Sequence, residues 1–199
     1  SGALKRRLGT LSEGTVILSI RDPDITIIGD MNLALERARL EAPFFECKSL
    51  FRVDFRGCTK LTSVGNAAFA RCSSLKSVVL PDSLTQLGEY AFLRCSSLTS
   101  VVLPDSLTQI GVSAFLNCTS LMCLVLPDSL TELGEYAFQD CSSLTSVVLS
   151  DSLTQLGVSA FLKCTSLTCL VLPDSLTQIG EQAFGWCTSL TSVVLPDSL

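Results

Sequence analysis

A single 23-residue spacing governs most of this chain. Cysteine recurs at this step, and a phenylalanine stands three residues before each cysteine: Cys72, Cys95, Cys118, Cys141, Cys164 and Cys187 follow Phe69, Phe92, Phe115, Phe138, Phe161 and Phe184. A glycine keeps the same step from Gly88 to Gly180. One unit of this length cannot bury its apolar residues alone, so the units must stack on one another. The period therefore predicts a solenoid built of coils.

One unit reads LTSVVLPDSLTQIGVSAFLNCTS, residues 98–120. Alternation predicts a strand over 98–103 with Val101 inward and Ser100 and Val102 outward. We expect a type I turn over residues 103–106 with Pro104 second, then a short second strand that ends at a glycine, which permits a bend. A short helix or helical turn is predicted over 112–118. Stacking would place equivalent strands about 4.8 Å apart in a parallel sheet.

The full pattern, L-x-x-V-x-L-P-x-S-L-T-x-I-G-x-x-A-F-x-x-C, resembles the BspA-like, or Treponema-type, leucine-rich repeats. It matches closely over 75–199 and more loosely over 48–74. The resemblance implies an α/β repeat solenoid: a curved, right-handed coil with a parallel sheet on its concave side and short helices or 3-10 turns on its convex side. It also implies protein binding. Several members of the family are surface proteins of bacteria and protists, and some act as adhesins.

The repeats divide the chain into two parts. We predict an N-terminal cap over 1–46, with a degenerate repeat at 16–30 and an amphipathic helix before Pro43, and a solenoid of about six repeats over 47–199. The last repeat is incomplete and shows no cap. We expect either that the natural protein continues or that another chain covers this edge, which makes self-association through the last coil one hypothesis.

Charge is divided unevenly along the chain. Residues 1–71 hold 11 basic and 8 acidic side chains, whereas residues 72–199 hold 3 basic and 11 acidic ones. An acidic repeat region repels phosphates, so nucleic acid is not an expected partner and a basic protein surface is. The same charge also serves solubility. No apolar run approaches the roughly 18 residues of a membrane helix, so membrane insertion is not expected.

The ten cysteines and the absence of histidine restrict the chemistry. We predict that the repeated cysteines are buried, reduced thiols. Cys123 and Cys169 fall in the outward serine position, two coils or about 10 Å apart, which is too far for one bridge. Free thiols and the lack of a signal peptide favour an intracellular location; the sequon at Asn117 leaves a secreted or cell-surface protein as the alternative.

The repeated Asp of PDSLT raises the possibility of a carboxylate array. Each coil supplies only one: Asp82, Asp105, Asp128, Asp151, Asp174 and Asp197. A calcium site needs several oxygens that converge on one point, so we interpret these residues as exposed corners and expect no metal and no cofactor. No catalytic motif is present, and histidine, the commonest general base, is missing. We therefore do not expect an enzyme.

The best candidate for a binding site is the outward face of the first strand. Its residues are Ser100, Val102, Cys123, Val125, Ser146, Val148, Cys169 and Val171. A small, apolar face without charge suits a protein partner, although valine also simply favours strands. The main hypothesis is a non-enzymatic interaction scaffold that binds a protein on this concave Val/Ser face. The alternatives are an assembly module that stacks through its last coil and a cell-surface adhesin.

Overall fold

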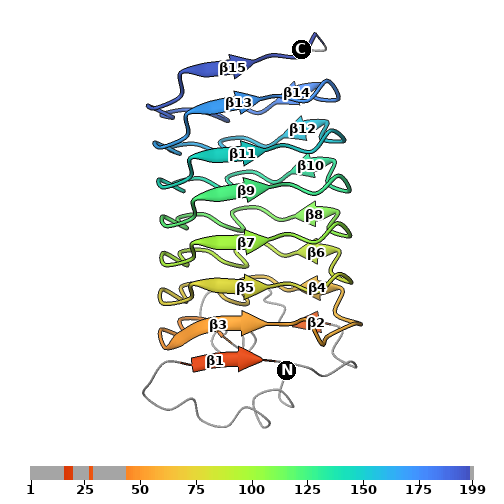
Figure 1. The fold of residues 1–199 in the computed structure, drawn as a ribbon, viewed down its shortest axis with the longest axis vertical. Coiled ribbons are helices and arrows are strands. Elements are labelled where there is room, and N and C mark those ends of the chain that lie inside the picture. Colours follow the sequence, from red (N-terminus) through yellow and green to blue (C-terminus); the bar gives the residue numbers. More distant parts are fainter. Residues whose placement is uncertain (1–15, 20–26, 29–43, 198–199) are drawn as a thin grey trace.

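The chain forms a column of stacked coils in which each coil adds one strand to each of two faces (Figure 1). The computed structural model describes residues 16–19, 27–28 and 44–197. The first face comprises β1 (Val16–Ser19), β3 (Leu50–Asp54), β5 (Ser77–Val79), β7 (Ser100–Val102), β9 (Cys123–Val125), β11 (Ser146–Val148), β13 (Cys169–Val171) and β15 (Ser192–Val194). The second comprises β2 (Ile27–Ile28), β4 (Ser63–Val64), β6 (Gln86–Leu87), β8 (Gln109–Ile110), β10 (Glu132–Leu133), β12 (Gln155–Leu156) and β14 (Gln178–Ile179).

All strand pairs are parallel, and the repeat sets their register. Val78 lies opposite Val101 and Leu87 opposite Ile110, so equivalent positions of successive coils are neighbours. β1 pairs with β3 and β2 with β4, so the degenerate repeat adds a first coil. The amphipathic helix predicted before Pro43 lies outside the described residues, and the boundary of the cap at residue 46 stays a prediction.

The core consists of columns of identical side chains. Successive phenylalanine rings from Phe44 to Phe184 stack with centroids 5.0–5.7 Å apart and planes within 10° of parallel. The 23-residue step does not predict Phe44 in this series, because Phe44 lies 25 residues before Phe69. The stacked rings contribute roughly 0.5–1.5 kcal/mol per pair beyond the area that they bury.

The cysteines of the repeat form a second column, as predicted. All six thiols from Cys72 to Cys187 are buried and unbridged. Each Sγ also donates a hydrogen bond to the phenylalanine carbonyl of the preceding coil, for example Cys95 to Phe69 O at 3.1 Å and Cys118 to Phe92 O at 3.2 Å. The thiol thus fills a small apolar space and satisfies a buried acceptor at the same time, which a methyl group cannot do.

The short helices or helical turns predicted for this segment are not confirmed: in the described part of the chain no helix is present, and residues 112–117 and their equivalents form consecutive turns. Backbone N–H groups alternate between two partners: Tyr90 and Phe92 donate to the next coil, and Ala91 and Leu93 donate to the residue three positions back. An α-helix is about 10 Å wide, whereas coils joined by a ladder are about 4.8 Å apart. Helices would not fit at this spacing.

Hydrogen bonds join neighbouring coils on both faces and along the turn segment. That the face of the first strands is the concave one stays a prediction. We call the outer surface of the first sheet the Val/Ser face and define it by the eight residues given above.

The PDSLT corner is a turn, but its register differs from the prediction by one residue. Leu107 N donates to Pro104 O at 3.0 Å, so proline is the first residue of the turn, and Asp105 and Ser106 occupy its centre. The serine hydroxyl donates to the preceding coil, as Ser106 does to Leu84 O at 2.6 Å. Where Ser150 replaces proline, its own hydroxyl accepts from Ser152 N at 3.0 Å and supports the same turn.

Candidate functional site: the Val/Ser face and its acidic border

The Val/Ser face exposes an apolar column on the parallel strands of the first face, whose ladder is divided between β7 and β9 and between β11 and β13. The strands place Val79 beside Val102, Val125 beside Val148 and Val171 beside Val194. Between 58% and 75% of the surface of Val102, Val125, Val148 and Val171 is accessible. Isolated exposed valines are ordinary, but a continuous column of them is not.

A second column of small side chains lies beside the valines. Ser77 neighbours Ser100, Cys123 neighbours Ser146, and Cys169 neighbours Ser192. Cys123 and Cys169 are exposed, as predicted, whereas the cysteines of the repeat are buried. These side chains are smaller than valine, so the valines are the largest of the eight side chains that define the face.

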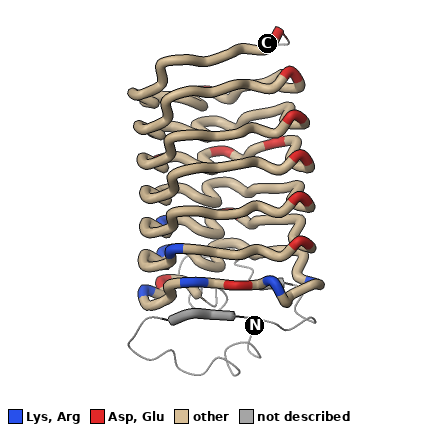
Figure 2. Tube along the Cα trace, in the orientation of Figure 1, with Lys and Arg blue, Asp and Glu red and all other residues tan. Residues whose placement is uncertain are grey.

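One edge of this face is acidic along its whole length. The corner aspartates follow the valines by three residues in every coil, roughly 10 Å along the chain, and Figure 2 shows them as a row at the edge of the column. All six, from Asp82 to Asp197, are exposed. No hydrogen bond or ion pair joins Asp82, Asp105, Asp128, Asp151 or Asp174 to another residue in the described parts of the chain. Their charge faces solvent.

The face changes character at β3. Arg52 takes the serine position, opposite Ser77, and Asp54 takes the valine position, opposite Val79. The Arg56 guanidinium contacts both carboxylate oxygens of Asp54, with Nη2 to Oδ2 at 2.6 Å, and Arg56 N donates to Oδ1 at 3.1 Å. The hydrogen bond from Arg56 lowers the pKa of Asp54 to about 2. The apolar column therefore ends at Val79 and meets a charged coil.

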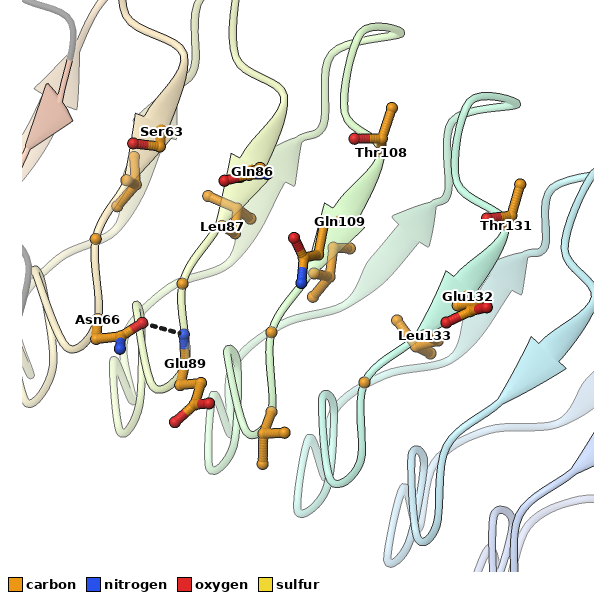
Figure 3. A pocket seen from close by; sticks show the side chains of 17 residues that line it. Ser63, Asn66, Gln86, Leu87, Glu89, Thr108, Gln109, Thr131, Glu132 and Leu133 are labelled. Carbon is orange, nitrogen blue, oxygen red and sulfur yellow. Dashed lines mark hydrogen bonds between the residues drawn. The ribbon is translucent and has the colours of Figure 1, made fainter. Parts of the chain in front are cut away.

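A groove of about 870 Å³ runs along the second sheet, on the other side of the corner. Figure 3 shows its polar lining, in which Gln86, Gln109 and Glu132 project from successive coils. Backbone from Gly88, Gly111 and Gly134 forms part of the same wall. Thr108 Oγ1 is already engaged, since it donates to Thr85 O at 3.1 Å. The groove offers amides and single carboxylates beside the apolar residues Leu87, Ile110 and Leu133.

The described residues contain no cluster of three or more histidine, cysteine, aspartate or glutamate side chains that could hold a metal ion. In the same residues, no helix is long and apolar enough to span a membrane. Burial raises the pKa of the Cys72 and Cys141 thiols to about 12, so these thiols are poor nucleophiles near neutral pH.

Sequence reasoning placed all eight residues of the Val/Ser face on one surface, where the structure also has them. The aspartates are predicted as exposed corners of the repeat, and they are exposed, but that prediction does not connect them with the valines. The signal was present, because valine and aspartate keep a constant spacing of three residues from β5 to β15. It also missed the groove, whose shape arises from the bend between two segments rather than from a motif.

The coils, sheets and ladders described above define a parallel leucine-rich-repeat solenoid. A model of the "BspA type Leucine rich repeat region" matches residues 40–144 and 108–199, with six copies. The chain therefore belongs to the BspA-type leucine-rich-repeat family, whose members are generally non-enzymatic proteins that interact with other proteins or are associated with surfaces. No relative with curated annotation matches the sequence.

Three solved structures are similar in sequence and fold. A leucine-rich repeat protein from Bacteroides ovatus shares 30% identity at a TM-score of 0.81, over 92% of this chain and 46% of that one. The T. pallidum leucine-rich repeat protein shares 32% sequence identity at a TM-score of 0.77, and the match covers 91% of this chain and 80% of that one. A leucine rich cell surface protein from Faecalibacterium prausnitzii shares 31% sequence identity at a TM-score of 0.71, and the match covers 85% of this chain and 42% of that one. The chain thus spans less than half of the first and third of these proteins.

Proposed function

We propose that this chain is a non-enzymatic recognition module and that its Val/Ser face binds a protein partner. The exposed valine column carries the proposal. Parallel sheets normally have both faces covered, yet the outer face of this sheet presents Val102, Val125, Val148 and Val171 to solvent. A partner that covers these side chains gains hydrophobic free energy of roughly 25 cal/mol for each Å² of apolar surface removed from water.

The test replaces Val102, Val125 and Val148 together by lysine. These side chains are exposed, so the fold should persist, and circular dichroism with thermal unfolding checks this. The immobilised wild-type chain is used to capture proteins from a cell extract of the source organism. We expect the variant to lose these proteins, because binding would require three lysine charges to be desolvated in the interface.

The matched control places the same three lysines on the second sheet, at Gln109, Gln155 and Gln178, which are exposed as well. It adds the same charge and should retain the same proteins. Retention by the Val102, Val125 and Val148 variant, or equal loss by both variants, would show that the Val/Ser face is not the binding surface.

A cell-surface location is a second proposal, and it rests on the similarity to the Faecalibacterium cell surface protein. Treatment of intact cells with a protease that cannot cross the membrane should then degrade the protein, and full protection would argue for the intracellular alternative.

Self-association remains a separate prediction. Sedimentation velocity at high concentration tests it, and a strict monomer contradicts it.

A further inference from the structure

Beyond the choice of face, the structure indicates the chemistry of the partner. We infer that the Val/Ser face binds a basic amphipathic α-helix whose apolar side covers the valine column and whose lysine or arginine side chains lie along the corner aspartates. This inference rests on the proposed function, since it assumes that the Val/Ser face is the binding surface.

The apolar column sets the shape of the partner. Helices are the elements that ordinarily cover the faces of parallel sheets. The valine column advances by five coil steps from Val79 to Val194, which corresponds to about 24 Å at a spacing of about 4.8 Å. A helix rises 1.5 Å per residue, so about 16 residues match this length. A helix of that size presents one apolar stripe, as the valine column requires.

The aspartate row sets the charge of the partner. It runs beside the valine column at one carboxylate per coil, and none of Asp82, Asp105, Asp128, Asp151 and Asp174 has a compensating cation among the described residues. In the repeat region, residues 72–199, three basic side chains face eleven acidic ones. A basic flank on the helix relieves the repulsion along the row and is attracted to it over about a Debye length.

The coil of β3 sets the limit of the site. Arg52 and Arg56 are exposed there, and Asp54 stands in the valine position with its carboxylate held by Arg56. Lys76 is also exposed, directly before β5, with its Nζ 5.0 Å from the centre of the Phe51 ring. Figure 2 shows the basic residues gathered at this end of the described column. A basic helix is repelled at β3 and loses its apolar contact there. The favourable region therefore extends from β5 to β15.

The probe is a synthetic 16-residue amphipathic helix with a leucine stripe and lysines on one flank. Its first twin carries glutamate in place of each lysine, and its second has the same composition in a scrambled order that removes the stripe. We expect the lysine helix to bind, with an affinity that falls as salt is added, and both twins to bind at least tenfold more weakly by isothermal titration calorimetry.

Two charge variants of the full chain locate the electrostatic contact. The first variant combines Asp105→Asn, Asp128→Asn and Asp151→Asn. It should bind the lysine helix about tenfold more weakly, because three exposed ion pairs are lost. The control, Glu89→Gln, Glu135→Gln and Glu181→Gln together, changes the net charge equally on the turn segment and should leave the affinity within about twofold. Equal weakening by both variants would overturn the inference in favour of non-specific attraction.

The chain also carries its own reporters of position. Cys123 and Cys169 are exposed within the Val/Ser face. The bound lysine helix should slow their alkylation by iodoacetamide, as mass spectrometry of the two peptides measures, and Cys47, outside the face, should react at an unchanged rate. Unprotected Cys123 and Cys169, or no binding of the lysine helix, overturns the inference.

Failure of the basic-helix inference and failure of the proposed function give different results. If the glutamate twin binds as tightly as the lysine helix and protects the same thiols, the partner is not selected by its basic charge, and the Val/Ser face remains the binding surface. If the lysine variant at Val102, Val125 and Val148 still captures its natural partners, the proposed function itself is wrong.

Discussion

At the scale of single residues, the glycine column shows how closely the coils approach each other. Gly134 does not have positive φ, so its backbone conformation does not by itself require glycine. A Cβ atom built there would lie 2.7 Å from Ile110 O and 2.8 Å from Gly111 C, both backbone atoms of the preceding coil. Only a residue without a side chain permits this contact, which explains why glycine recurs at the period of the repeat.

Gly134→Ala should therefore destabilise the protein by about 2 kcal/mol or more, because the backbone ladders prevent the coils from separating. Urea denaturation measures the change. Gly185→Ala is the control: its Cβ would meet the end of the flexible Leu162 side chain at 2.8 Å, which can move aside. We expect a loss below about 1 kcal/mol there. Equal losses at the two positions would contradict the role assigned to the glycine column.

At the scale of the element, the turn segment replaces the expected helix by a backbone of unusual conformation. In each coil from Ala67 to Trp186, two residues other than glycine have positive φ, for example Ser159 at 54° and Lys163 at 60°. This conformation costs roughly 1–2 kcal/mol for a residue with a Cβ atom. The hydrogen bonds that alternate within and between coils stabilise it.

Lys163→Gly should therefore raise the free energy of unfolding by a few tenths to about 1 kcal/mol, because glycine relieves the strain but also gains entropy in the unfolded chain. Thermal and urea unfolding measure the change. Glu135→Gly, at an exposed turn residue without positive φ, should instead cost about 0.5–1 kcal/mol. If both substitutions destabilise the protein alike, the positive φ at Lys163 carries no strain.

The same segment shows where sequence reasoning succeeds and where it stops. The period of two in LTSVVLP placed Val101 inside and Val102 outside correctly, because alternation is a direct consequence of strand geometry. The AFLNC segment has no such unique interpretation. Its apolar spacing fits a helix, and the alternative depends on hydrogen bonds to residues 22 positions away, such as Phe92 N to Ala114 O, which local propensity does not describe.

At the scale of the whole molecule, the cysteine column makes stability depend on pH. Burial raises the pKa of Cys72 and Cys141 to about 12 and also raises those of Cys95, Cys118 and Cys164. In the unfolded chain these thiols titrate near 8.5. Between the unfolded and folded values the unfolded state loses protons that the folded state keeps, so stability falls as pH rises.

We expect the free energy of unfolding to be nearly constant from pH 7 to 8 and to fall steeply above about pH 9, by up to about 1.4 kcal/mol per pH unit for each buried thiol. Urea titrations across this range give the slope. In Cys141→Ser the hydroxyl keeps a hydrogen-bond donor but does not titrate in this pH range. The free energy of unfolding of this variant should therefore fall less steeply, by up to about 1.4 kcal/mol per pH unit. An unchanged slope would mean that the thiol is not protected by burial.

The stacking of the coils also determines how the column responds to force. Each coil stores 23 residues in about 5 Å of axial length, whereas the same residues fully extended reach roughly 80 Å. We expect tension along the axis to unfold the coils one at a time, so that each unfolding coil lengthens the column by about 75 Å while the other coils stay folded.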